Sequence, residues 1–196
     1  MKKGQSYHHG DLGAALLREA LVQVETSGAG AMSARAVARA VGVDAAAAYR
    51  HYKDKRALLA AVSAQGFEAL GQSMVMGVGG AHESLLLRQA RAYVSFGLAR
   101  GHLYRLMFGG MVSVEQVGEF KAQGAPSPYA LLTQALDALW ENHQWAPERR
   151  HGAEFQTWSS LHGAVSLRLE GRAAAIVPDA QLGAFVVEGL VRSWKG

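Results

Sequence analysis

The stretch from Ser33 to Lys55 constrains the fold of this chain more than any other. It reads SARAVARAVGVDAAAAYRHYKDK. Apolar residues recur at three- and four-residue spacing before Gly42, which predicts an amphipathic helix that ends at this glycine. Ser33 is expected to cap that helix, and Asp44 to cap a second one over residues 45–51, because each side chain can accept a backbone N–H of the first turn.

The second helix combines four alanines with a polar and basic end. Small side chains let its backbone lie close to a large smooth surface, and the tyrosine, arginine and histidine that follow supply hydrogen bonds and positive charge. Small residues and then basic residues after a glycine turn are typical of a helix-turn-helix that reads DNA. The alternative is an ordinary alanine-rich helix pair in an all-α protein.

Positive charge is concentrated beside this motif. Residues 1–56 contain nine Lys and Arg against five Asp and Glu, whereas residues 57–196 contain eleven of each. The asymmetry favours an anionic partner for the N-terminal segment, most simply a phosphate backbone. A general solubilising bias is the alternative.

Length and composition exclude several classes of protein. The 196 residues suffice for one large domain or two small ones. The absence of cysteine excludes disulfides, thiolate metal sites and cysteine nucleophiles. No apolar signal-peptide core follows Lys2 and Lys3, and no uncharged apolar run reaches about 18 residues. We therefore expect a soluble cytoplasmic protein without a membrane partner.

Helical periodicity continues through the rest of the chain, and no segment shows sustained two-residue alternation. We therefore expect an all-α fold without a sheet: an N-terminal three-helix head and a C-terminal antiparallel helical bundle. The expected division is a DNA-binding domain over residues 1–54 and a ligand-binding and dimerisation domain over 55–196. Further helices are expected over residues 7–27, 55–76, 82–100, 102–108, 111–123, 128–142, 147–172 and 178–194.

The last two helices have the spacing of a helical bundle. Two such helices that meet their copies would form a four-helix dimer interface, with Gly163 and Gly189 permitting close approach. A protein that reads a palindrome needs two reading heads, which favours a homodimer over a monomer whose core these helices complete. The candidate interface residues are Phe155, Trp158, Val165, Leu169, Leu182, Phe185, Val186, Gly189 and Ser193.

These motifs resemble the tetracycline repressor (TetR) family of bacterial transcriptional regulators. The resemblance rests on YHHGDL, SARAVARAVGV and AAAYRHYKDKRALLAAV within residues 7–70. GLARGHLYRLMFG and WSSLHG are similar to one subgroup with a Trp-x-x-x-His-Gly C-terminal domain. The resemblance implies an all-α homodimer in which a three-helix head binds DNA. It also implies a bundle that binds a small ligand and dimerises through its last two long helices.

The resemblance also implies residue roles in the head. Tyr49 and Lys55 occupy positions that usually touch phosphates, and Ala45, Ala46 and Arg50 lie on the reading helix. The alanines offer no donors to base edges, so specificity would rest on Arg50, methyl contacts and DNA shape. Asp44 departs from the family, which often has serine or threonine there. The candidate DNA contacts are Lys2, Lys3, Ser33, Arg35, Ala45, Ala46, Tyr49, Arg50, His51, Tyr52 and Lys55.

An unknown small-molecule effector would bind between helices of the C-terminal bundle. His102 and His162 are the expected polar groups of an otherwise apolar pocket. Each candidate residue is also a plausible core residue. The pocket candidates are Tyr93, His102, Tyr104, Met107, Phe108, Trp140, Trp158 and His162.

The resulting hypothesis is a ligand-responsive repressor that binds double-stranded DNA at a palindromic operator and is released by a small molecule. One alternative is a helical-bundle metalloenzyme, because Glu148 and His151 have the spacing of a di-iron ligand pair. No second such pair and no G-x-S-x-G, P-loop or dinucleotide motif accompanies them. A DNA-binding protein without ligand regulation is the other alternative. We expect no enzymatic activity, no cofactor and no metal, and do not expect His8 and His9 to bind one.

Overall fold

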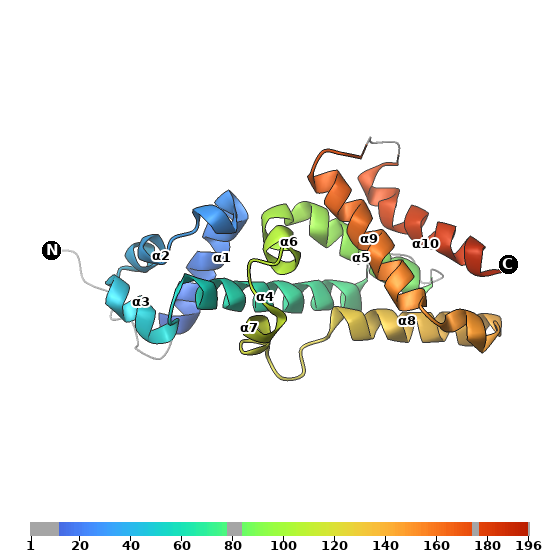
Figure 1. The fold of residues 1–196 in the computed structure, drawn as a ribbon, viewed down its shortest axis with the longest axis horizontal. Coiled ribbons are helices and arrows are strands. Elements are labelled where there is room, and N and C mark those ends of the chain that lie inside the picture. Colours follow the sequence, from blue (N-terminus) through green and yellow to red (C-terminus); the bar gives the residue numbers. More distant parts are fainter. Residues whose placement is uncertain (1–11, 78–83, 174–176, 196) are drawn as a thin grey trace. The chain divides into compact units, whose positions relative to one another are not determined.

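The computed structural model describes residues 12–77, 84–173 and 177–195 (Figure 1). All regular elements within these ranges are helices, so the expected all-α fold is confirmed. They are α1 (Leu12–Ala31), α2 (Ala34–Val41), α3 (Ala45–His51), α4 (Lys55–Met76), α5 (Leu85–Ala99), α6 (Gly101–Phe108), α7 (Val114–Gly118), α8 (Pro128–His143), the 3-10 helix η1 (Pro147–Arg150), α9 (Ala153–Leu169) and α10 (Asp179–Lys195).

Two expected helices differ from those observed. The helix expected over residues 147–172 is interrupted at Gly152, whose φ of 77° is left-handed, so η1 ends before it and α9 begins after it. The helix expected over residues 111–123 is reduced to the five residues of α7. A left-handed Gly28, with φ 81°, also interrupts the regular helical path of α1, in agreement with the expected end at residue 27.

Packing divides the chain into two compact units. The first consists of residues 1–66 and 102–121, so that α6 and α7 belong with α1, α2, α3 and the first part of α4. The second consists of residues 67–101 and 122–196. This is a division by packing, and the functional division expected after residue 54 stays a prediction.

The first unit has an apolar core between its helices. α1 packs on α2, and α2 packs on α3. Leu16, Val24 and Val37 expose none of their surface, which follows from their positions on the apolar stripes of α1 and α2. The residues on the apolar stripes of these helices are therefore the ones that are buried in the head.

α6 and the segment that follows α7 are attached to this unit by specific contacts. A Cβ added at Gly66 of α4 would lie 2.6 Å from Met107 Sδ of α6, which leaves room only for glycine unless Met107 moves. Phe120 packs beside Tyr52, with 6.0 Å between the two ring centroids. The end of α3 is thereby covered by a segment that comes 68 residues later in the sequence.

In the second unit, α5 packs against α8, α9 and α10. α10 approaches α5 most closely at Gly183, where an added Cβ would lie 2.7 Å from the carbonyl oxygen of Ala90. Gly163, expected to permit close approach, has no atom within 4 Å of its Cβ position, and Gly189 has only Arg192 Nη2 at 3.9 Å. Of these three glycines, Gly183 is therefore the one that makes a tight contact within the chain.

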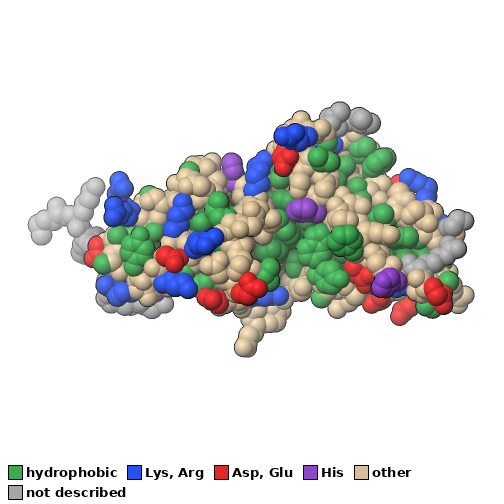
Figure 2. All heavy atoms as spheres, viewed as in Figure 1, with side chains coloured by type: hydrophobic (Ala, Val, Ile, Leu, Met, Phe, Trp, Pro, Cys, Tyr) green, Lys and Arg blue, Asp and Glu red, His purple; other side chains and the backbone are tan. Residues whose placement is uncertain are grey.

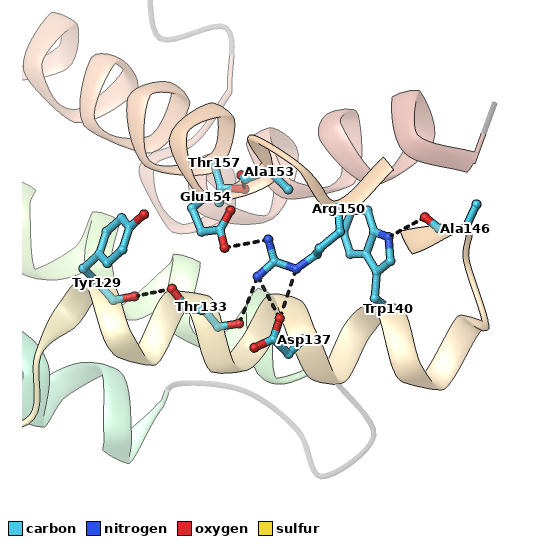
Figure 3. A network of polar contacts seen from close by, with 9 residues as sticks. All are labelled: Tyr129, Thr133, Asp137, Trp140, Ala146, Arg150, Ala153, Glu154 and Thr157. Carbon is cyan, nitrogen blue, oxygen red and sulfur yellow. Dashed lines mark hydrogen bonds and ion pairs between the residues drawn. The ribbon is translucent and has the colours of Figure 1, made fainter. Parts of the chain in front are cut away.

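One half-buried arginine joins α8 to α9 (Figure 3). The guanidinium of Arg150 donates through Nε and Nη2 to Asp137 Oδ1, at 3.1 and 2.9 Å, and its Nη1 lies 2.6 Å from Glu154 Oε1. Nη2 also donates to the carbonyl oxygen of Thr133, and the guanidinium lies 5.7 Å from the centroid of the Trp140 ring. Planar arginine is suited to such a site because its donors diverge in fixed directions.

The contact at Gly183 predicts an asymmetry between two glycine substitutions. We expect Gly183→Ala to lower the free energy of unfolding by about 1–3 kcal/mol, because the added methyl group meets backbone atoms that cannot rotate away. We expect Gly163→Ala, the matched control, to raise it by up to about 1 kcal/mol, because alanine favours a helix and has room there. Urea unfolding of both variants measures the difference, and equal effects would contradict the packing described here.

Candidate nucleic-acid interface and buried polar cluster

The turn between α2 and α3 is fixed by the expected caps. Ser33 Oγ accepts a hydrogen bond from the Ala36 N–H at 3.5 Å, and Asp44 Oδ1 accepts one from the Ala47 N–H at 2.6 Å. Gly42 ends α2 with a left-handed φ of 83°. These contacts confirm the helix-turn-helix geometry predicted from the sequence.

α3 has an inner and an outer face. Ala47 and Ala48 are 6% and 4% exposed and form the inner face, whereas Ala46, Tyr49 and Arg50 are exposed. The outer face therefore presents a small residue beside a phenol and a guanidinium. Such a face can approach a broad surface closely and still donate hydrogen bonds.

Several cations near α3 are exposed and form no ion pair in the described part of the chain: Arg35, Arg39, Arg50, Lys53 and Arg56. Lys and Arg side chains can be seen over α1, α2, α3 and the start of α4 on the face shown in Figure 2. Arg35 and Arg50 are among the candidate DNA contacts predicted from the sequence. The other three belong to the basic cluster that the charge asymmetry already identified in this segment, but were not among those candidates.

The acidic residues beside this face are used as helix caps. Asp44 caps α3, and Asp54 Oδ1 accepts the Ala57 N–H at 2.8 Å at the start of α4. A carboxylate at a helix N-terminus is offset by the positive end of the helix dipole. The negative charges are thus partly compensated inside the head, while the five cations remain available to a partner.

Three of the candidate DNA contacts turn toward α1 instead. Tyr52 Oη donates to the carbonyl oxygen of Gly13 at 3.1 Å, and burial raises the pKa of this phenol. The imidazole of His51 lies beside the same glycine, whose Cβ position is 3.3 Å from Nδ1. Lys55 Nζ donates to the carbonyl oxygen of Gly30 at 3.0 Å. The observed contacts of these three side chains hold the head together, and their contact with DNA stays a prediction.

The remaining candidate DNA contacts differ in location and exposure. Lys2 and Lys3 lie outside the described residues. Ala45 is half-buried in the first turn of α3, and Ser33 and Arg35 are exposed at the start of α2. The outward set is suited to a polyanion, because guanidinium groups bind phosphates and the O6 and N7 atoms of guanine.

The candidate pocket residues are divided between the two packing units. On α6, Tyr104 and Met107 are buried, and the Tyr104 and Phe108 rings are 4.7 Å apart. His102 is exposed and lies beside the left-handed Gly28 of α1, whose Cβ position is 3.2 Å from Nδ1. These residues form part of the first unit.

Two of the tryptophans pack against aromatic rings of other helices in the second unit, Trp140 in the core and Trp158 at a half-buried position. Trp140 Nε1 donates to the carbonyl oxygen of Ala146 at 3.3 Å, and its ring lies 5.1 Å from that of Trp194. The Trp158 ring on α9 packs against Tyr129 of α8 at 5.3 Å. Both contacts join helices of the bundle.

The structure does bring Tyr93 and His162 together. Tyr93 Oη lies 3.5 Å from His162 Nδ1, and Ser166 Oγ lies 3.4 Å from Nε2. Burial lowers the pKa of His162 from its ordinary value of 6.5, which favours the neutral imidazole. Gln89, one turn before Tyr93, is 3% exposed, and its Oε1 has no hydrogen-bond partner in the described structure.

This polar cluster between α5 and α9 has the composition of a site for a neutral, hydrogen-bonding group. Sequence reasoning found Tyr93 and His162 and missed Gln89 and Ser166. The residue type alone does not distinguish Gln89 from a surface glutamine. Its position on the apolar stripe of α5, one turn before Tyr93, is the signal that could have identified it as buried.

The candidate interface residues on α9 and α10 fall into three groups by their exposure. Phe155 and Phe185 are 78% and 56% exposed, and Ser193 is also exposed. Val165 and Leu182 are 0% and 9% exposed and belong to the core of their own chain, so their side chains are not available to a partner. The half-buried candidates are Trp158, Leu169, Val186 and Gly189.

Two further features bear on function. No three His, Asp or Glu side chains of the described residues are grouped so as to hold a metal ion. Glu148 lies in η1, and His151 is exposed just after it. None of the described helices combines the length and apolar character needed to span a membrane.

Two protein-family models match the chain. The model described as "Bacterial regulatory proteins, tetR family" matches residues 16–62, which include α2 and α3. The model described as "Tetracyclin repressor-like, C-terminal domain" matches residues 86–190. No match was found among curated proteins.

Solved structures share the fold. A protein of unknown function from Rhodococcus sp. RHA1 is 27% identical with a TM-score of 0.76, over 98% of this chain and 100% of that one. The TetR family regulator PfmR from Thermus thermophilus is 19% identical with a TM-score of 0.63, over 90% and 97%. A TetR variant from Acinetobacter baumannii AYE, in complex with minocycline, is 18% identical with a TM-score of 0.58, over 97% and 96%.

The lowered pKa of His162 predicts a pH-dependent stability. Below pH 6.5 the unfolded imidazole takes up a proton before the folded one, so stability present above that pH is lost as the pH falls toward the folded pKa. We expect His162→Gln to remove this contribution. Urea unfolding at pH 7.5 and 5.5 measures it for both proteins, and an unchanged difference in the variant would contradict the assignment.

Proposed function

This chain belongs to the tetracycline repressor (TetR) family of bacterial regulatory proteins, and we propose that it is a cytoplasmic repressor of transcription. In this proposal a homodimer binds a palindromic DNA operator and leaves it when a small molecule binds. The observation that carries the proposal is the outer face of α3, where exposed Tyr49 and Arg50 stand among cations that form no ion pair within the described residues.

α3 would read the operator from the major groove. Ala46 lets the helix approach the bases closely, and its methyl group can contact the methyl group of thymine. Arg50 is the residue on this face able to bind guanine through two hydrogen bonds. With so few base-reading groups, DNA shape would contribute the remaining specificity.

The cations around α3 would bind phosphates. Arg35, Arg39, Lys53 and Arg56 are exposed and have no ion pair within the described ranges, so binding DNA does not require them to break one there. Lys55 acts differently in this proposal, because its ammonium already donates to the carbonyl oxygen of Gly30. It would position α4 against α1 and hold the head in shape.

The second copy would dock on the outer faces of α9 and α10. Phe155 and Phe185 expose large apolar rings, which are costly to leave in water and are enriched at protein interfaces. A symmetric pair of chains would present two heads to half-sites about 34–36 Å apart, or a multiple of that distance.

The effector would engage the polar cluster of Tyr93 and His162 between α5 and α9, with buried Gln89 one turn earlier on α5. A neutral imidazole and an unpaired amide oxygen favour a ligand that donates and accepts hydrogen bonds. A neighbour of the same fold was solved in complex with minocycline, which supports a small-molecule effector for this chain.

Selection of bound sites from random DNA tests the central proposal, and a palindromic consensus is expected. On the selected duplex, we expect Arg50→Ala to weaken binding by about 1–3 kcal/mol and to relax the preference at one base pair. We expect Lys53→Ala to weaken binding to selected and scrambled duplexes alike and to reduce the salt slope by about 1. Fluorescence anisotropy across a salt series measures both effects.

Arg172→Gln is the matched control, because this arginine is exposed on the C-terminal unit and is paired with Glu170. It should leave DNA binding unchanged. Wild-type affinity and an unchanged salt slope in both Arg50→Ala and Lys53→Ala would reject the proposed interface.

The proposed dimer is tested by replacing each exposed aromatic ring with a charged side chain. We expect Phe155→Glu combined with Phe185→Glu to convert the dimer to a monomer, because two carboxylates would be buried in the seam without partners. Val75→Glu, at a 60% exposed position near the end of α4, is the control and should stay dimeric. Sedimentation equilibrium measures the masses, and a double variant that remains dimeric would place the interface elsewhere.

A further inference from the structure

A groove of about 320 Å³ lies among three helices of the second unit, separate from the residues that line the polar cluster. It is bordered by the start of α5, the end of α8 and the last turns of α10, helices that all belong to this unit (Figure 1). Its volume is at the lower end of the range for small-molecule sites. No residue outside the described ranges is needed to define it.

The floor of the groove is apolar. Leu139 of α8 and Val187 of α10 are 7% and 2% exposed, and half-buried Leu87 and Val191 complete the lining from α5 and α10. These four aliphatic side chains offer no hydrogen bonds. The part of a ligand that contacts them must therefore be hydrocarbon.

The rim of the groove carries an excess of positive charge. Arg192 and Lys195 line it from the last turns of α10, and neither forms an ion pair in the described part of the chain. Their position near the end of α10 is also favourable to the helix dipole. Glu188 is the acidic lining residue and likewise has no ion pair there, so these three charges leave one positive charge unbalanced.

The apolar floor of the groove is not on the face of α10 that a second copy is proposed to cover. Val187, Val191 and Lys195 follow one another at four-residue spacing, and so do Phe185 and Gly189 on the proposed dimer face. The two rows are offset by two residues, or about 200° around the helix. A dimer formed through Phe185 therefore leaves the apolar floor uncovered. Arg192 follows Phe185 by seven residues, and its Nη2 lies 3.9 Å from the Cβ position of Gly189, so this cation borders both the groove and the dimer face.

We propose that this groove binds an amphipathic monoanion, an alkyl carboxylate of medium chain length. The alkyl chain lies on the four aliphatic side chains, and the carboxylate is held between Arg192 and Lys195. Apolar contact supplies most of the affinity, and the two cations select for a negative head group. The site differs in chemistry from the neutral Tyr93–His162 cluster, and it does not depend on DNA binding.

Calorimetric titration of the full chain with hexanoate, octanoate and decanoate tests the alkyl part. Each added methylene that is buried is expected to tighten binding by up to about fourfold. 1-Octanol, which has the same chain length and no charge, is expected to bind at least about tenfold more weakly than octanoate, because it cannot form a charge-assisted contact with either cation. Equal binding of octanol and octanoate would overturn the proposal.

Substitutions locate the site. Arg192→Gln with Lys195→Gln is expected to weaken octanoate binding by about tenfold or more, whereas Glu188→Gln is expected to strengthen it by removing a like charge. Val191→Trp, which fills the groove without changing any charge, is expected to abolish binding. Arg172→Gln removes one positive charge from the same unit outside the groove and is expected to bind octanoate as the wild type does.

The same titrations can reject the proposal. Wild-type octanoate affinity in the Arg192 and Lys195 double variant, or in Val191→Trp, would place the ligand elsewhere in the chain. A change of oligomeric state on adding octanoate, measured by sedimentation, would mean that the groove is covered by a second copy. DNA binding of the same variants is measured in parallel, so failure at this groove is distinguishable from failure of the proposed regulator.

Discussion

The outer face of α3 depends on a helix that is too short to be stable by itself. Isolated helices below about 12–15 residues are marginal in water, and α3 has seven. Asp44 fixes its first turn, Ala47 and Ala48 bury its inner side, and Tyr52 fixes its end through the carbonyl oxygen of Gly13. Arg50 is directed outward because these contacts leave α3 only one exposed face.

The two packing units use their charged residues differently. In the described part of the head, Asp44 and Asp54 cap helices and the five exposed cations near α3 form no ion pair, which leaves positive charge on the surface. In the second unit, Arg150 pairs with Asp137 and Glu154, and Arg168 pairs with Asp179. These pairs join successive elements of the same unit. The contrast indicates that these paired cations of the second unit stabilise its fold, whereas the five exposed cations near α3 are available for a partner.

Local signals predicted much of this fold, because caps and glycine turns depend on neighbours in sequence. Asp44 and Gly42 do what their spacing indicates. The inward contact of Lys55 was not predictable, because its partner, the carbonyl oxygen of Gly30, lies 25 residues earlier and only the tertiary fold of the head brings the two groups together. Gly183 could not be distinguished from Gly163 for the same reason. The difference arises only when α10 packs on α5 and brings the carbonyl oxygen of Ala90 against Gly183.

The packing of α6 and α7 with the first 66 residues affects how the head behaves in isolation. A fragment that stops at Gly66 removes Met107 from beside that glycine and Phe120 from beside Tyr52. Apolar surface that is covered in the whole chain would then be exposed to solvent. Tyr52, which ends α3, would lose its contact with Phe120. An excised head is thus less stable than the same residues in the intact protein. Its measured affinity for DNA would therefore be lower than that of the head in the full chain.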